Sequence, residues 1–167
     1  MEMPDYNGFV AALAENDQPK AAFAALEALT KDVVGVKLFT IMTSDTTEKL
    51  SERVYSNMPE AYPVSGTKPY NDTHWSEIAL KQRRTFVANT IAEIAEVFDD
   101  HQLIKSLGCE SVINIPIVID GEVVGTINCL HEAGFYTEDR VKAAEALKLP
   151  AAVCMLLHVN LKDGNRK

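Results

Sequence analysis

The segment VINIPIVIDGEVVGTINCLHE, residues 112–132, decides the fold of this chain. Two apolar runs flank the dipeptide Asp120-Gly121, which favours a tight turn between antiparallel strands. The segment therefore predicts a hairpin whose side chains are mostly buried. One asparagine lies in the middle of each run, at Asn114 and Asn128. A buried amide destabilises a sheet unless it finds a hydrogen-bond partner, so these two residues mark an unusual environment.

The register of this hairpin decides whether the two amides meet. A two-residue Asp120-Gly121 turn places Asn114 and Asn128 on opposite faces of the sheet, because side chains alternate along each strand. A β-bulge at Gly121 adds one residue to the second strand and places both amides on the same face. The residues alone leave both registers open.

The rest of the chain predicts helices at both ends and further strands between them. We expect one domain over residues 1–167, with helical ends at 4–31 and 137–160 and a kink or split at Pro150. An order with few parallel crossovers indicates an α+β fold with an antiparallel sheet. Predicted helices span 5–15, 20–31, 74–83, parts of 90–107 and 137–160, and predicted strands span 33–43, 49–57, 85–89 and the two runs of 112–132.

Composition excludes several classes of partner. The net charge of −8 argues against nucleic acid and anionic membranes, which require a basic surface. The sequence shows no signal peptide and no apolar stretch of membrane-spanning length. Three widely spaced cysteines fit the reducing cytoplasm better than a disulfide framework. We therefore expect a cytoplasmic protein that binds neither nucleic acid nor membrane.

Two consecutive segments carry a resemblance to a known family. SLGCESVINIPIVIDGEVVGTINCLHE (106–132) and FYTEDRVKAAEAL (135–147) resemble the closing strands and the start of the last helix of the GAF domain family. The stretch RVYSNMPEAYPVSGTKPYNDTHW (53–75) resembles the loop region of stand-alone bacterial members. The sequence lacks the N-K-F-D-E signature of cyclic-nucleotide GAF domains. Because members bind very different small molecules, the resemblance specifies a fold and a cavity but no ligand.

The resemblance implies an antiparallel sheet with terminal helices on one face and a roof of short helices over a ligand cavity on the other. It implies the bulged hairpin, with both asparagines facing the cavity, and a homodimer that pairs through the terminal helices. A small organic molecule then contacts the amides, whereas the alternative is that backbone groups of the roof satisfy them. The implied cavity residues on the hairpin are Val112, Asn114, Thr126, Asn128 and Leu130.

Other cavity candidates come from the second predicted strand, the loop and the roof. Aromatic side chains around a few polar groups are typical of a small-molecule pocket, although a core beneath a long loop looks similar. His101 is a further candidate as a donor to an anionic ligand, with a solvated side chain behind an Asp99 helix cap as its alternative. The remaining candidates are Arg53, Tyr55, Tyr62, Trp75, Phe98 and Cys109, while Phe86 is assigned to the core.

Two further functions remain open. Cys109 lies where a related reductase of free methionine sulfoxide has its nucleophilic thiol, but Cys129 and Cys154 are not clustered near it. The other possibility is a structural dimer without a ligand. The four histidines show no metal-binding spacing with each other or with the cysteines. A small-molecule-binding sensory or regulatory domain is the preferred interpretation, with its cofactor unknown.

Overall fold

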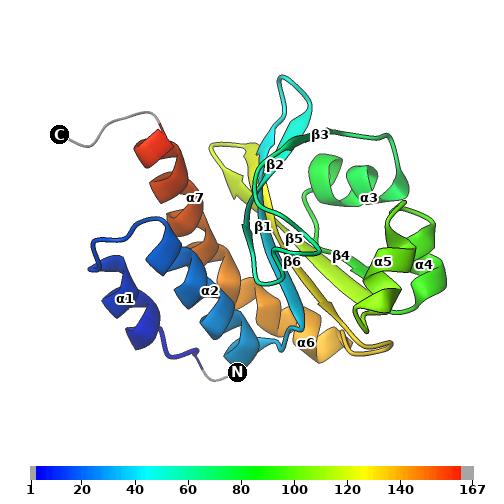
Figure 1. The fold of residues 1–167 in the computed structure, drawn as a ribbon, viewed down its shortest axis with the longest axis horizontal. Helices are drawn as coiled ribbons and strands as arrows, with labels where there is room; N and C mark the ends of the chain where they lie inside the picture. Colours follow the sequence, from blue (N-terminus) through cyan, green and yellow to red (C-terminus); the bar gives the residue numbers. More distant parts are fainter. Residues whose placement is uncertain (1–2, 163–167) are drawn as a thin grey trace.

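A computed structural model describes residues 3–162 of the chain (Figure 1). Of the predicted domain, residues 1–2 and 163–167 lie outside the described residues. The elements in order are α1 (Asn7–Leu13), α2 (Lys20–Val33), β1 (Leu38–Asp45), β2 (Leu50–Ser56), β3 (Thr67–Pro69), α3 (His74–Ser76), a π-helical turn η1 (Glu77–Lys81), β4 (Phe86–Ala88), α4 (Ile91–Ala95), α5 (His101–Ser106), β5 (Ser111–Ile119), β6 (Glu122–His131), α6 (Glu138–Ala143), a 3₁₀ turn η2 (Ala144–Leu147) and α7 (Lys148–Lys162).

The six strands form one antiparallel sheet in the order β3-β2-β1-β6-β5-β4. Figure 1 shows α1, α2, α6 and α7 on one side of this sheet and α3, α4 and α5 on the other. The α+β class, the antiparallel sheet and the two helical layers predicted from the sequence are confirmed.

The hairpin register shows why the two asparagines share a face. Asp120 and Gly121 form a plain two-residue turn with positive φ at both residues, as a type I′ hairpin requires. The bulge lies at Val124, because Val118 pairs with Val123 while Ile117 pairs with Gly125. The predicted bulge position at Gly121 is therefore wrong. The predicted consequence holds, since Asn114 and Asn128 lie directly opposite each other.

The first strand begins five residues later than predicted. Helix α2 continues to Val33, and Gly35 then takes a φ of +87° and donates its N–H to the Thr30 carbonyl at 3.0 Å. This is the left-handed termination common at helix ends, so β1 starts only at Leu38. The β-branched residues Val33, Val34 and Val36 favoured a strand, but they complete the helix and its exit turn.

The C-terminal helix is split, but the split lies at residues 144–147 and not at Pro150, where it was predicted. Thr137 caps α6 by accepting the Arg140 N–H, and the 3₁₀ turn η2 separates α6 from α7. Pro150 lies in the first turn of α7, where its missing N–H leaves no helical hydrogen bond unmade. The run Glu138–Leu161 is long and apolar enough to cross a membrane by length and composition, although one face of it packs into the core through Leu147, Ala151, Cys154 and Met155.

Candidate functional site

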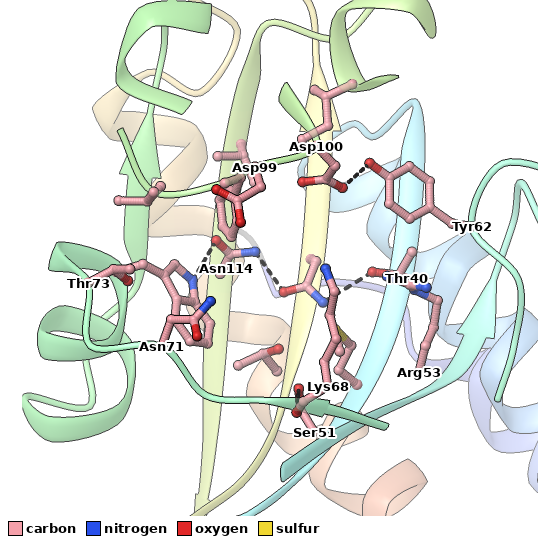
Figure 2. A pocket seen from close by; sticks show the side chains of 18 of the residues that line it. Thr40, Ser51, Arg53, Tyr62, Lys68, Asn71, Thr73, Asp99, Asp100 and Asn114 are labelled. Atoms are coloured by element: carbon pink, nitrogen blue, oxygen red, sulfur yellow. Dashed lines mark hydrogen bonds between the residues drawn. The ribbon is translucent and has the colours of Figure 1, made fainter. Parts of the chain in front are cut away.

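A cavity of about 260 Å³ lies between the sheet and the roof of short helices (Figure 2). Strands β1, β2, β5 and β6 form its floor, and β3, the loop after it and the α4–α5 region form its walls. The lining residues are Leu38, Thr40, Met42, Ser44, Ser51, Arg53, Tyr62, Lys68, Pro69, Tyr70, Asn71, Thr73, Trp75, Val97, Phe98, Asp99, Asp100, Ile104, Val112, Asn114, Thr126, Asn128 and Leu130.

Four side chains form a continuous row of hydrogen bonds across the floor, which we call the floor chain. The Trp75 indole N–H donates to Asn114 Oδ1 at 2.9 Å, and Asn114 Nδ2 donates to Asn128 Oδ1 at 2.7 Å. Asn128 Nδ2 then donates to Thr40 Oγ1 at 3.1 Å. Figure 2 shows these bonds running from one wall of the cavity to the other. The asparagines are thus held by side chains and by each other, rather than by backbone groups of the roof.

The floor chain has a fixed direction. An indole N–H can only donate, so Asn114 must present its oxygen to Trp75 and its amino group to Asn128. The same reasoning turns the Asn128 amino group toward Thr40, whose hydroxyl accepts and keeps its own O–H as a donor. Each amide also retains a second N–H with no hydrogen bond within residues 3–162. The floor therefore offers donors to whatever occupies the cavity.

Arg53 lies half-buried in the cavity wall beside this floor. Its Nη1 donates to the Pro63 carbonyl at 3.3 Å, and its guanidinium lies 4.9 Å from the centre of the Tyr62 ring. The Nε–H is buried and has no hydrogen-bond partner among the described residues. Burial lowers the pKa of Arg53, but an arginine stays charged at neutral pH. The wall thus holds a cation with unused donor capacity.

Tyr62 joins the loop to the roof on the same side. Its hydroxyl donates to Asp100 Oδ2 at 2.5 Å, and burial together with this carboxylate raises the Tyr62 pKa far above its ordinary value. The phenol therefore remains a neutral donor at physiological pH. This bond uses one oxygen of Asp100, and Figure 2 shows the exposed carboxylate of Asp99 beside Asp100, near Asn114.

The structure brings nine of the twelve predicted site residues to the cavity. Tyr55, His101 and Cys109 do not line it. The nine lining residues are Arg53, Tyr62, Trp75, Phe98, Val112, Asn114, Thr126, Asn128 and Leu130.

The predicted placement of Tyr55 beside Arg53 is wrong. Ile41 pairs with Tyr55 while Met42 pairs with Arg53, so β2 carries a bulge at Val54. The extra residue reverses the alternation of side chains and turns Tyr55 to the face of the sheet that the terminal helices cover. There its hydroxyl donates to Glu27 at 2.7 Å and its ring packs edge-on against Phe23.

His101 lies in the first turn of α5, outside the cavity lining. Its Nδ1 is 3.1 Å from the Phe98 carbonyl oxygen. The predicted helix cap at Asp99 is also wrong, because Asp100 occupies the N-cap position and its side chain makes no capping hydrogen bond. The local turn of the chain thus directs the Asp99 and Asp100 side chains to the cavity and His101 away from its lining.

Cys109 is buried under the roof but does not reach the cavity surface. Burial raises the pKa of its thiol, although Lys37 acts in the opposite direction, so little thiolate forms at neutral pH. Cys129 and Cys154 lie in the core on the other face of the sheet, and burial raises the pKa of Cys154 to about 12. The sheet therefore separates Cys109 from both possible resolving thiols.

We expect Cys109→Ser to cost about 1 kcal/mol of stability, because a buried thiol is replaced by a more polar hydroxyl. Ligand binding should stay within error of the wild type, and neither protein should reduce free methionine sulfoxide with a dithiol. Reductase activity that this substitution abolishes would show that Cys109 is a nucleophile.

The cavity also contains residues that sequence reasoning missed. Thr40, Met42 and Ser44 lie on β1, and their alternation with the buried Phe39 and Ile41 was a usable signal. Lys68 comes from β3, which pairs with β2 after a proline-rich loop. The Ser65-Gly66 pair before it is a turn signal, but three residues are too few to show the alternation of a strand. Among residues 3–162, no group of three or more His, Cys, Asp or Glu side chains is placed to hold a metal ion.

A family model for the GAF domain matches residues 16–155, which is most of the chain. The protein therefore belongs to the GAF domain family, whose members are small-molecule-binding sensory domains. A sequence comparison with curated proteins found no match.

Solved structures show the same fold at low sequence identity. The GAF domain of a two-component sensor histidine kinase from Bacillus halodurans is 19% identical, with a TM-score of 0.67 over 87% of this chain and 98% of that one. The GAF domain of an Acinetobacter phosphoenolpyruvate-protein phosphotransferase is 11% identical, with a TM-score of 0.69 over 95% and 93%. The phycoerythrobilin-bound GAF domain of a cyanobacterial phytochrome is 15% identical, with a TM-score of 0.64 over 91% and 93%.

Proposed function

We propose that this protein is a ligand-responsive regulatory module that binds a compact organic molecule in the roofed cavity. The floor chain is the observation that carries the proposal. It immobilises four polar side chains at the bottom of the cavity and leaves the Thr40 O–H and one N–H of each amide without a hydrogen bond to residues 3–162. A purely structural core would replace such a row by apolar side chains without loss, since buried amides add desolvation cost.

The size of the cavity supports a small ligand. Its volume of about 260 Å³ lies just below the range of roughly 300–1,000 Å³ that is typical of sites for drug-sized molecules. Apolar side chains such as Leu38, Val112 and Leu130 share the lining with the polar floor. The site therefore suits a molecule with one polar end and a short apolar body.

A thermal-shift screen with a metabolite library tests this function. A ligand at one hundred times its Kd adds about 2.7 kcal/mol of stability, which raises the Tm by roughly 5–11 °C for a chain of this size. Ser51→Phe, at a partly exposed cavity position, should abolish the shift by narrowing the cavity. Tyr55→Phe, on the opposite face, should preserve it. A library without any stabilising compound would contradict the proposal.

We also propose that the protein is a homodimer paired through its terminal helices. Leu149, Leu156 and Val159 on α7 are 73%, 56% and 51% exposed, and Val10 on α1 is 60% exposed. Residues 149, 156 and 159 share a helical face, because they are spaced by seven and three positions. Large apolar side chains gathered in this way favour burial against a second copy.

Light scattering should give twice the chain mass of 18.4 kDa for the wild type at micromolar concentrations. Leu156→Glu should convert the protein to a monomer with an unchanged circular dichroism spectrum, because the side chain is exposed within one chain. Val87→Glu, at an exposed apolar position on β4, is the matched control and should leave the mass unchanged. A monomeric wild type would contradict the dimer.

A cytoplasmic location is part of the same proposal. The three cysteines are free and buried, which suits a reducing compartment.

A further inference from the structure

Building on the function proposed above, we infer that the cavity ligand carries a carboxylate, which binds between the guanidinium of Arg53 and the hydroxyl of Thr40. Figure 2 shows both side chains on the same side of the cavity, with Asp99 farther away, near Asn114. The two groups belong to adjacent strands, β2 and β1, so the sheet fixes their separation.

The direction of the floor chain is the first step toward this ligand class. Every bond in it runs from Trp75 toward Thr40, so the row ends in a hydroxyl that has already accepted a hydrogen bond. That hydroxyl and the second N–H of Asn128 are donors. A ligand group that meets them must accept hydrogen bonds, and a carboxylate accepts several at once.

The guanidinium of Arg53 supplies the second step. Its Nη1 donates to the Pro63 carbonyl, and its Cζ lies 4.9 Å from the centre of the Tyr62 ring. The Nε–H, which has no partner among residues 3–162, lies on the same edge of the guanidinium as Nη2. That edge is the pair of parallel donors that a carboxylate accepts in bidentate fashion.

The charges around Arg53 supply the third step. Arg53 forms no ion pair with a carboxylate within the described part of the chain. The nearby Asp100 carboxylate accepts from Tyr62 and attracts Arg53 without forming an ion pair with it, and Lys68 adds a second cation to the cavity wall. An anionic group on the ligand would make the direct ion pair that Arg53 lacks among residues 3–162.

Three substitutions separate charge recognition from folding. Arg53→Gln removes the cation, and Arg53→Lys retains charge without the paired donors. Asn128→Asp keeps the floor chain intact, because the new carboxylate accepts from Asn114 Nδ2 and from the Thr40 hydroxyl, but it repels an anionic ligand. Tyr55→Phe is the control on the other face of the sheet. Circular dichroism and thermal unfolding establish that each variant is folded.

The probe is a small-molecule extract of bacterial cells, incubated at pH 8 with each full-length protein and removed by gel filtration. Compounds that elute with the protein are released by denaturation and identified by mass spectrometry. We expect the wild type and Tyr55→Phe to retain a compound with a carboxylate. Arg53→Gln and Asn128→Asp should retain at least 10-fold less of it, and Arg53→Lys an intermediate amount.

The outcomes distinguish this inference from the proposed function. Retention of a compound without a carboxylate would overturn the inference and leave the ligand-binding function standing. Equal retention of a carboxylate by the folded Arg53→Gln and Asn128→Asp variants would also overturn it. A wild type that retains nothing would overturn both.

Discussion

Replacing Gly125 by alanine should lower the free energy of unfolding by about 3 kcal/mol. A Cβ at this position would lie 2.3 Å from the Met42 carbonyl oxygen and 2.7 Å from the terminal methyl of Met155. The methionine side chain can move, but the carbonyl belongs to the backbone of β1, which pairs with β6 here. The two strands would therefore have to separate, and the Tm should fall by roughly 6–12 °C.

Gly8→Ala is the matched control for this substitution. Gly8 lies within α1, and a Cβ added there meets no atom of residues 3–162 within 4 Å apart from its chain neighbours and the backbone of its own helix. Alanine there should raise stability by about 0.5–1 kcal/mol, because glycine is a poor helix former. A Gly125→Ala variant as stable as the wild type by denaturant unfolding would show that β1 and β6 do not approach so closely.

Asn128→Leu should have the second largest effect, about 1–3 kcal/mol of lost stability together with loss of ligand binding. The leucine leaves Asn114 Nδ2 without its acceptor and Thr40 Oγ1 without its donor. Both partner residues are about 5% exposed, so water replaces the lost bonds poorly. Equilibrium urea unfolding gives the free-energy change.

A double-mutant cycle with Asn114→Leu makes this prediction sharper. Each single substitution strands the other amide, whereas the double substitution removes both. The double variant should therefore lose at least about 0.5 kcal/mol less than the sum of the single losses. Additive losses would show that the two amides do not act as a pair.

The fold could be predicted because its strongest signals are local. The Asp120-Gly121 turn, the apolar runs beside it and the helical C-terminal part predicted from residue 137 all appear in the structure. These features depend on residues close together in the chain. The structure differs from the prediction mainly at the boundaries between elements. The late start of β1 at Leu38 is an example, because Gly35 terminates the preceding helix.

The candidate site was harder to predict, because two bulges decide which side chains face the cavity. Val124 and Val54 are the extra residues of these bulges. Valine is also common in regular strands, so its presence does not mark a bulge. The bulge at Val124 brings the two asparagines together, while the bulge at Val54 turns Tyr55 away from Arg53. A bulge depends on pairing with a distant strand, so a single sequence carries little trace of it.

The partners of the asparagines were also beyond sequence reasoning. Ligand contact and satisfaction by the roof backbone were the two alternatives, yet the structure satisfies the amides through Trp75, Thr40 and each other. Trp75 and Thr40 lie 39 and 88 residues from their respective asparagine partners. Such contacts follow from the closed sheet and its roof rather than from any local pattern.

Native mass spectrometry of the freshly purified protein tests most directly whether the cavity is a ligand site. We expect part of the wild-type protein to carry the additional mass of a compact organic molecule and to lose it on denaturation. Asn128→Leu should carry no such mass, and Tyr55→Phe should carry as much as the wild type. A wild-type protein without additional mass, even after incubation with a cell extract, would contradict the proposal that the floor chain serves a ligand.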